Sequence, residues 1–139
     1  MFTIDWTPDL EVGVAEIDED HRVMVAMLNR IMKAGGRHET TQAVLEELGR
    51  YTLHHFEREE RLMVECRYEF ADLHRREHRA LYDEIRHQID DLIARERRLS
   101  ELAKFMQRWL LRHIVAEDRL LALAIRRHRE TQVTAESED

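Results

Sequence analysis

Apolar residues recur at alternating spacings of three and four positions in four long segments of the chain, which is the pattern of helices that bury one face. The first helix is expected to begin after Asp18, a good N-cap, and to end at Gly35-Gly36. The others are expected from Thr40 or Thr41 to about 66, from about 70 to 96, and from Ser100 to about 128. Short connections between helices of similar length imply antiparallel neighbours. The sequence therefore predicts an all-α, up-down-up-down four-helix bundle.

The remaining residues are expected to flank one domain. Residues 1–17 contain Pro8 and Gly13 and predict an extended N-terminal arm. Residues 129–139 are polar and predict a disordered tail. The predicted organisation is a single domain over residues 1–128, followed by that tail.

The apolar faces of the predicted helices contain histidines where hydrophobic residues are expected. Five of the nine histidines fall on these faces, together with one glutamate: His21, His55, Glu59, His74, His78 and His113. One buried histidine usually finds a hydrogen-bond partner. Each buried polar group left unpaired costs about 1–3 kcal/mol, so five cost about 5–15 kcal/mol, comparable with the stability of a whole domain. A bound metal satisfies them together, because it accepts their lone pairs and balances the carboxylate charge.

The number and type of these residues restrict the metal. Six candidate ligands exceed the four of a tetrahedral zinc site, and imidazole mixed with carboxylate suits iron, with two ions favoured over one. Helix geometry does not choose iron over manganese or cobalt. On the fourth helix the wheel favours Glu117 as a further ligand, because Asp118, five residues after His113, is turned about 140° away.

The composition restricts the function. The chain has 139 residues, a net charge of −7 and a single cysteine, Cys66. The negative charge argues against a nucleic-acid partner, and one cysteine provides neither a disulfide framework nor a thiolate metal site. No uncharged run approaches the roughly 20 residues of a membrane span, and the N-terminus lacks the features of a signal peptide. We expect a soluble, cytoplasmic protein without a membrane partner.

Four segments together resemble the hemerythrins, in particular the bacterial single-domain members: WTPDLEVGVAEIDEDH, HFEREERLM, HRREH and HIVAED. The resemblance covers about residues 6–123. It implies a non-haem diiron centre whose ligands are His21, His55, Glu59, His74, His78, His113 and Asp118. It therefore places the last carboxylate at Asp118, with Glu117 as the alternative from the helix wheel.

The resemblance also implies how these ligands are divided. Glu59 and Asp118 would bridge the two irons, together with a solvent-derived oxygen bridge. His74, His78 and His113 would complete one iron, whereas His21 and His55 would leave the other with a position open for O2. An apolar wall would keep the site dry, and the residues that we predict for it are Met24, Leu28, Leu62, Trp109 and Ile114.

Two departures from the family pattern are visible. Arg67-Tyr68-Glu69 stands where the family often has Gly-Tyr-Pro, which is expected to change the turn without touching a ligand. Asp20 replaces the glutamine commonly found before the first histidine and is expected to place a charge beside His21. Four other histidines match no ligand position and are predicted to be surface residues or to support the ligands: His38, His54, His87 and His128.

The expected function is reversible O2 binding by a carrier, store or delivery protein, not an enzyme, with a protein acceptor of O2 as a possible partner. The alternatives on the same scaffold are an O2 or redox sensor that acts through a partner, and a diiron oxidase or O2 scavenger.

Two motifs favour other classes of protein. HRREH fits the H-x-x-E-H pattern of inverted zinc proteases, with Glu77 as the base. One Glu-x-x-His pair, Glu84 and His87, fits a ferritin-like oxidase, which needs two such pairs.

Overall fold

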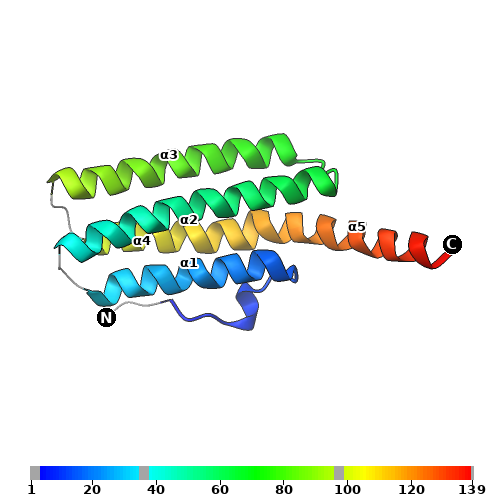
Figure 1. Ribbon diagram of the computed structural model, residues 1–139, viewed down its shortest axis with the longest axis horizontal. Coiled ribbons are helices and arrows are strands. Elements are labelled where there is room, and N and C mark those ends of the chain that lie inside the picture. The colour runs from blue at the N-terminus through cyan, green and yellow to red at the C-terminus, as the bar shows by residue number, and fades with distance from the viewer. Residues whose placement is uncertain (1–3, 35–37, 96–98, 139) are drawn as a thin grey trace.

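The computed structural model describes residues 4–34, 38–95 and 99–138, and these residues contain helices and no strand. The helices are α1 (Ala15–Ala34), α2 (His38–Glu65), α3 (Ala71–Arg95), α4 (Leu99–His113) and α5 (Arg119–Glu138). A short 3-10 helix, Pro8–Leu10, lies in the N-terminal arm, and a π-helical segment, Ile114–Asp118, joins α4 to α5. Because α4, the π-helical segment and α5 follow one axis, they act as the fourth rod of an antiparallel up-down-up-down bundle (Figure 1). The predicted fold is confirmed.

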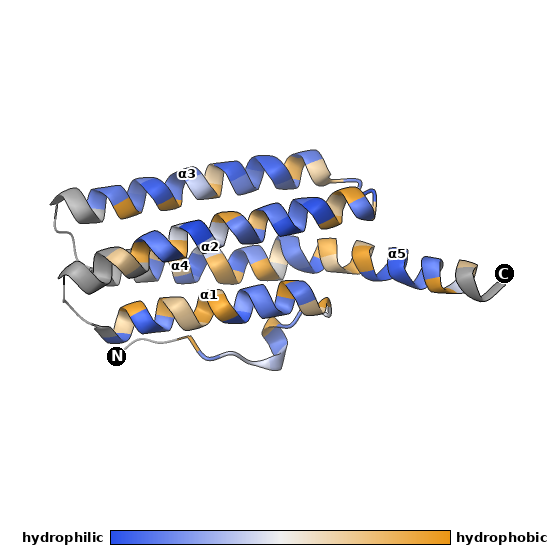
Figure 2. Ribbon diagram, in the orientation of Figure 1, coloured by the Kyte–Doolittle hydropathy of each residue, from blue (hydrophilic) through white to orange (hydrophobic). Residues whose placement is uncertain are grey.

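The core consists of apolar residues from all four rods, including Ile17, Leu48, Ile85 and Leu110, each at most 2% exposed. Most residues of α3 are hydrophilic (Figure 2). This composition fits a helix that packs along one face and exposes its other faces. Among the described residues, no helix has the length and apolar content that a membrane span requires.

The start of α1 differs from the expectation. The helix begins at Ala15, three residues before the predicted N-cap, and Asp18 lies in its first turn. The Asp18 carboxylate accepts hydrogen bonds from the backbone N–H groups of Val12 (2.8 Å) and Gly13 (3.2 Å). Gly13 has a φ of +89°, which glycine adopts at little cost. Asp18 therefore anchors the arm to the helix and does not cap it.

The turn between α2 and α3 reaches further than expected. Arg67 adopts a φ of +52°, the left-handed conformation in which glycine is usual. The backbone N–H of Tyr68 donates to the carbonyl of Met63 at 2.9 Å and closes the turn. Tyr68 is 9% exposed, and its ring lies edge-on to His74 with the centroids 6.2 Å apart. The turn thus contacts a candidate ligand through Tyr68, the residue that the family pattern shares, and not through the departures Arg67 and Glu69.

At the C-terminus, α5 continues to Glu138, although the helix was expected to end near residue 128. Its last part projects beyond the ends of the other helices (Figure 1). Arg129 forms an ion pair with Glu16 of α1, with 3.2 Å between Nη1 and Oε1. This contact holds the helix where the polar tail was expected to begin.

Candidate metal centre

The seven side chains that the sequence singled out lie together in the middle of the bundle. His21 comes from α1, two from α2, two from α3, and the last two from the end of α4 and the π-helical segment. The four-residue separations of His55 and Glu59, and of His74 and His78, place each pair on the inner side of its helix. All seven are between 0% and 4% exposed. Four distant parts of the sequence thus contribute to one polar cluster.

The seven residues form two groups of possible metal ligands that share both carboxylates. One group contains His74, His78 and His113, and the other contains His21 and His55. Each group also includes Glu59 and Asp118, and within each group one ligand atom per residue lies within 4.8 Å of the others. The arrangement thus offers two overlapping sets of possible ligands that have both carboxylates in common.

Each of the five imidazoles turns its Nε2 atom toward a bridging carboxylate. The shortest distance from each Nε2 to an oxygen of Glu59 or Asp118 is 2.8 Å for His21, 3.5 Å for His55, 3.3 Å for His74, 2.9 Å for His78 and 2.9 Å for His113. Ligand nitrogens and oxygens therefore face a common centre from all four rods.

The π-helical segment places Asp118 in this centre. The backbone N–H of Arg119 bonds to the carbonyl of Ile114, five residues earlier, as in a π turn. Such a turn takes up one residue more than an α turn, so a side chain five positions after His113 returns to the same side. Asp118 is 0% exposed and contacts both His21 and His113. The helix wheel, which assumed an α-helix, favoured Glu117 for that reason alone.

Glu117 instead supports the centre from outside. It accepts a hydrogen bond from Nδ1 of His113, which leaves the lone pair of Nε2 directed inward. Glu117 also lies near Glu77 of α3, and the two line the same grooves. Burial and the neighbouring Glu117 raise the pKa of Glu77 to about 7. Glu77 belongs to neither ligand group, so HRREH does not provide the geometry of a zinc protease.

Asp20 lies beside His55 and not, as expected, beside His21. Its carboxylate accepts a hydrogen bond from Nδ1 of His55 at 2.9 Å and one from the hydroxyl of Tyr51 at 3.2 Å. Nε of Arg58 lies 2.9 Å from the same carboxylate. Burial opposes ionisation of Asp20, but the hydrogen bond from His55 and the charge of Arg58 lower its pKa. No pattern in the sequence indicated this pairing, which joins residues 35 positions apart.

The unpaired atoms of the cluster fit a pair of metal ions. Within the described part of the chain, buried atoms without a hydrogen-bond partner include Nε2 of His55, His74 and His113, Oε2 of Glu59 and Oδ1 of Asp118. All five face the shared centre, where such orphaned atoms are costly unless a cation takes their lone pairs. The two fully buried carboxylates also need a countercharge. These residues are the donor set that a non-haem diiron pair requires.

The charges of the cluster attract one another strongly. Although burial disfavours the charged imidazole, Asp118 and Glu59 raise the pKa of His74 to about 9. The pKa of Glu59 is held well below its ordinary range, because the neighbouring histidines outweigh the effect of burial. A proton on His74 therefore balances part of the negative charge of these carboxylates, whereas burial lowers the pKa of His78.

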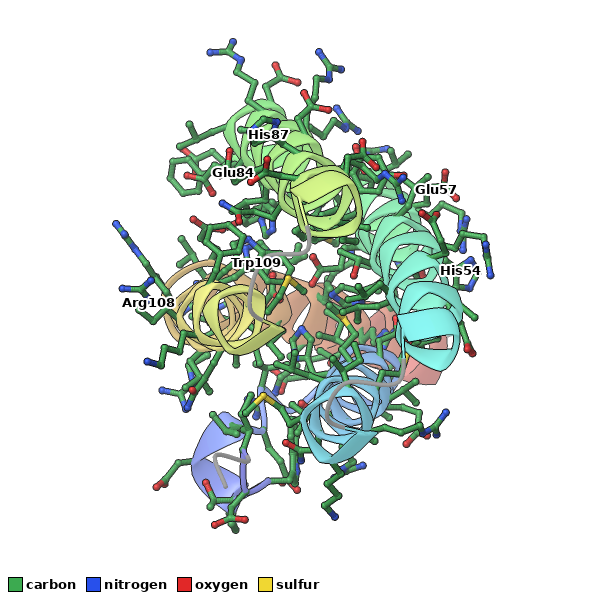
Figure 3. The ribbon with its side chains drawn as sticks, turned by 90° about the vertical axis from the view of Figure 1, so that its left-hand side faces the viewer. His54, Glu57, Glu84, His87, Arg108 and Trp109 are labelled. Atoms are coloured by element: carbon green, nitrogen blue, oxygen red, sulfur yellow. The ribbon has the colours of Figure 1, made fainter. Side chains whose placement is uncertain are left out.

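The residues predicted for the apolar wall are all buried: Met24, Leu28, Leu62, Trp109 and Ile114. Trp109 stacks on His113, with 5.7 Å between ring centroids and 11° between planes, so it lies at the three-histidine group. Figure 3 shows it between α3 and α4.

Three of the four other histidines have side chains that the structure describes, and these three lie away from the centre. His54 and His87 are exposed, and His128 is half-buried, whereas the side chain of His38 lies outside the described residues. Figure 3 shows His54 on the outer side of α2 and Glu84 with His87 on α3. Because Glu84 and His87 are both exposed, they provide no buried ligands for a ferritin-like oxidase.

Comparisons with known proteins agree on one family. The family model described as "Hemerythrin HHE cation binding domain" matches residues 12–125. A bacteriohemerythrin of Pseudomonas aeruginosa (strain LESB58) is 33% identical over 140 aligned residues, which cover 99% of this chain and 92% of that protein. A bacteriohemerythrin of Stenotrophomonas maltophilia (strain R551-3) is 31% identical, with 92% and 85% covered.

The fold is also found among solved structures. The crystal structure of a wild-type hemerythrin superposes with a TM-score of 0.80 at 25% sequence identity. The superposition covers 88% of this chain and 97% of that one. The likeness therefore extends over nearly the whole bundle.

Proposed function

The chain belongs to the hemerythrin family, and from that premise we propose that it binds O2 reversibly at a non-haem diiron centre, as an oxygen carrier, store or delivery protein. The ligands that we propose are His21, His55, Glu59, His74, His78, His113 and Asp118. The family is one of diiron O2-binding proteins, and the role of this member within it is our proposal.

The observation that carries the proposal is the inequality of the two ligand groups. With Glu59 and Asp118 shared, one group has three histidines and the other has two. A cation held by the smaller group, His21 and His55, would have one protein ligand fewer. O2 would bind at that position, because an ion held by three histidines would have one more protein ligand and no matching open coordination position. Two ferrous ions, when bound, supply the electrons that O2 takes up.

The side chains around the ligands would keep the binding reversible. Imidazoles held by Asp20 and Glu117 keep Nε2 directed inward, so little reorganisation accompanies binding. Met24, Leu28 and Ile114 are at most 3% exposed and exclude bulk water from the core. Exclusion of water would slow the protonation and loss of reduced O2, a loss that would leave the irons oxidised.

The test is the absorption spectrum of iron-loaded protein that is reduced anaerobically, exposed to O2 and then returned to an O2-free atmosphere. Charge-transfer bands that appear with O2 and fade on its removal support a reversible carrier. Bands that stay ferric after one exposure would contradict reversibility and favour a sensor, scavenger or oxidase. The absence of iron bands in protein grown with iron would contradict the diiron centre itself. Zinc-loaded protein is the control, since zinc has no redox chemistry.

A further inference from the structure

The seven proposed ligands are enclosed by helices, so a metal ion has to cross the wall of the bundle to reach them. Six of the seven are at most 2% exposed, and His74 is the most accessible at 4%. Among the described residues, surface grooves reach these ligands at two places, a larger groove beside His113 and a smaller one beside His74.

The smaller groove, of about 230 Å³, opens between α3 and the rod formed by the π-helical segment and α5. Its rim carries the exposed residues Leu73, Ala116 and Leu120, none of which is charged. Glu77 and Glu117 line it further in, next to His74. The groove thus leads from an uncharged rim, past two neighbouring carboxyl groups, to a proposed ligand.

We propose that Glu77 and Glu117 form a transit site, at which a hydrated divalent cation is held as it passes between solvent and the metal centre. This inference rests on the proposed diiron function. Carboxylate oxygens are suitable ligands for a cation that keeps part of its water. Glu117 contacts His113, and Glu77 lies one helical turn after His74 and lines the same groove, so the pair lies beside two of the proposed ligands.

The composition of the groove suits transit better than permanent binding. Among the described residues, the groups of three or more possible ligands lie in the core, and the groove adds only two carboxylates to its histidine. A cation held by two carboxylates retains water and is bound weakly enough to move on.

A second groove borders the same carboxyl pair but is less suited to a cation. It has a volume of about 540 Å³ and is lined by Arg108 and Arg112, both exposed, as well as by Trp109. Figure 3 shows Arg108 on the outer side of α4. The two guanidinium groups repel a divalent cation, whereas no positive residue lines the smaller groove.

The experiment measures iron release from ferrous, iron-loaded protein into excess 2,2′-bipyridine under anaerobic conditions, followed by the colour of the chelate. A transit site lowers the barrier in both directions, so its loss slows release without changing the iron content reached at equilibrium. We expect Glu77→Gln to slow release by about tenfold, because the neutral amide attracts the cation less. Leu73→Trp narrows the groove without changing any charge and should slow release as well.

Two controls locate the effect. Glu84→Gln removes an exposed carboxylate two turns further along α3 and should release iron at the wild-type rate. Arg112→Gln changes the larger groove, and its release rate should also stay at the wild-type value. Faster release from Arg112→Gln would show that the larger groove is the route and would overturn the proposal.

The remaining outcomes separate this inference from the proposed function. Wild-type or faster release from Glu77→Gln would overturn the transit site, while the diiron centre would stand if the O2-dependent bands were present. If Glu77→Gln fails to fold or to hold iron, Leu73→Trp decides, and unchanged release from it overturns the proposal. A wild-type chain that holds no iron would instead contradict the proposed function.

Discussion

The carboxylate of Asp20 lies 2.9 Å from Nδ1 of His55, although the two residues belong to different helices and are 35 positions apart. A carboxylate only accepts hydrogen bonds, so Nδ1 carries the proton and Nε2 keeps its lone pair for a metal. Arg58, whose Nε lies 2.9 Å from Asp20, balances the negative charge. Asp20 thus fixes the orientation of a ligand at the position proposed for O2.

Replacing Asp20 by asparagine should weaken iron binding about 10–100-fold, the usual cost of removing such a supporting partner. The amide can still accept the hydrogen bond from His55, but it has lost the charge that attracts Arg58 and polarises the imidazole. Competition with a chelator of known affinity measures the change. Asp83→Asn, at an exposed position of α3, is the matched control and should bind iron like the wild type. Equal affinities for both variants would remove the role assigned to Asp20.

Neighbouring histidines on α2 should behave differently. His55 is 1% exposed and faces Glu59, whereas His54 is exposed on the outer side of the helix. We expect His55→Ala to lose bound iron and His54→Ala to keep both ions, as measured by metal analysis after gel filtration. Retention of two irons and reversible O2 binding by His55→Ala would show that the ligand assignment is wrong.

The two acidic residues of the π-helical segment should also differ. Asp118 is 0% exposed between His21 and His113, whereas Glu117 lies at the outer side of His113. Asp118→Asn should abolish binding of the ion pair, because a bridging charge is lost. Glu117→Gln should retain two irons with weaker affinity, because an amide still accepts the hydrogen bond from His113. The opposite ranking in a metal titration would restore Glu117 as the ligand.

Iron binding should strengthen as the pH rises from 6 to 9. The pKa of His74 in the metal-free chain is raised to about 9, above the ordinary value of 6.5, so at neutral pH this imidazole is protonated. A metal needs the neutral form, and binding must release that proton. The apparent affinity should rise about tenfold per pH unit for each proton released. Calorimetry in buffers of different ionisation enthalpy counts the protons, and a count of zero at pH 7 would contradict the charge state assigned to His74.

Much of the fold and of the candidate centre could be predicted from the sequence. The spacing of apolar residues and the near absence of glycine and proline depend on local geometry alone, so they indicated four helices and placed five histidines and Glu59 on their inner faces. The cost of burying these groups unpaired then indicated a shared metal, since that argument needs no knowledge of how the helices pack.

Only the tertiary structure decided the features that depend on contacts between distant segments. A helix wheel assumes one uniform helix, so it could not anticipate the π turn that brings Asp118 inward and leaves Glu117 outside. The partners of Asp18 and Asp20 were equally hidden, because each carboxylate could serve several local donors and packing of the arm and of α2 selects among them. The start of the polar segment of α5 is held by an ion pair between Arg129 and Glu16 of α1, an interaction that no local pattern reports.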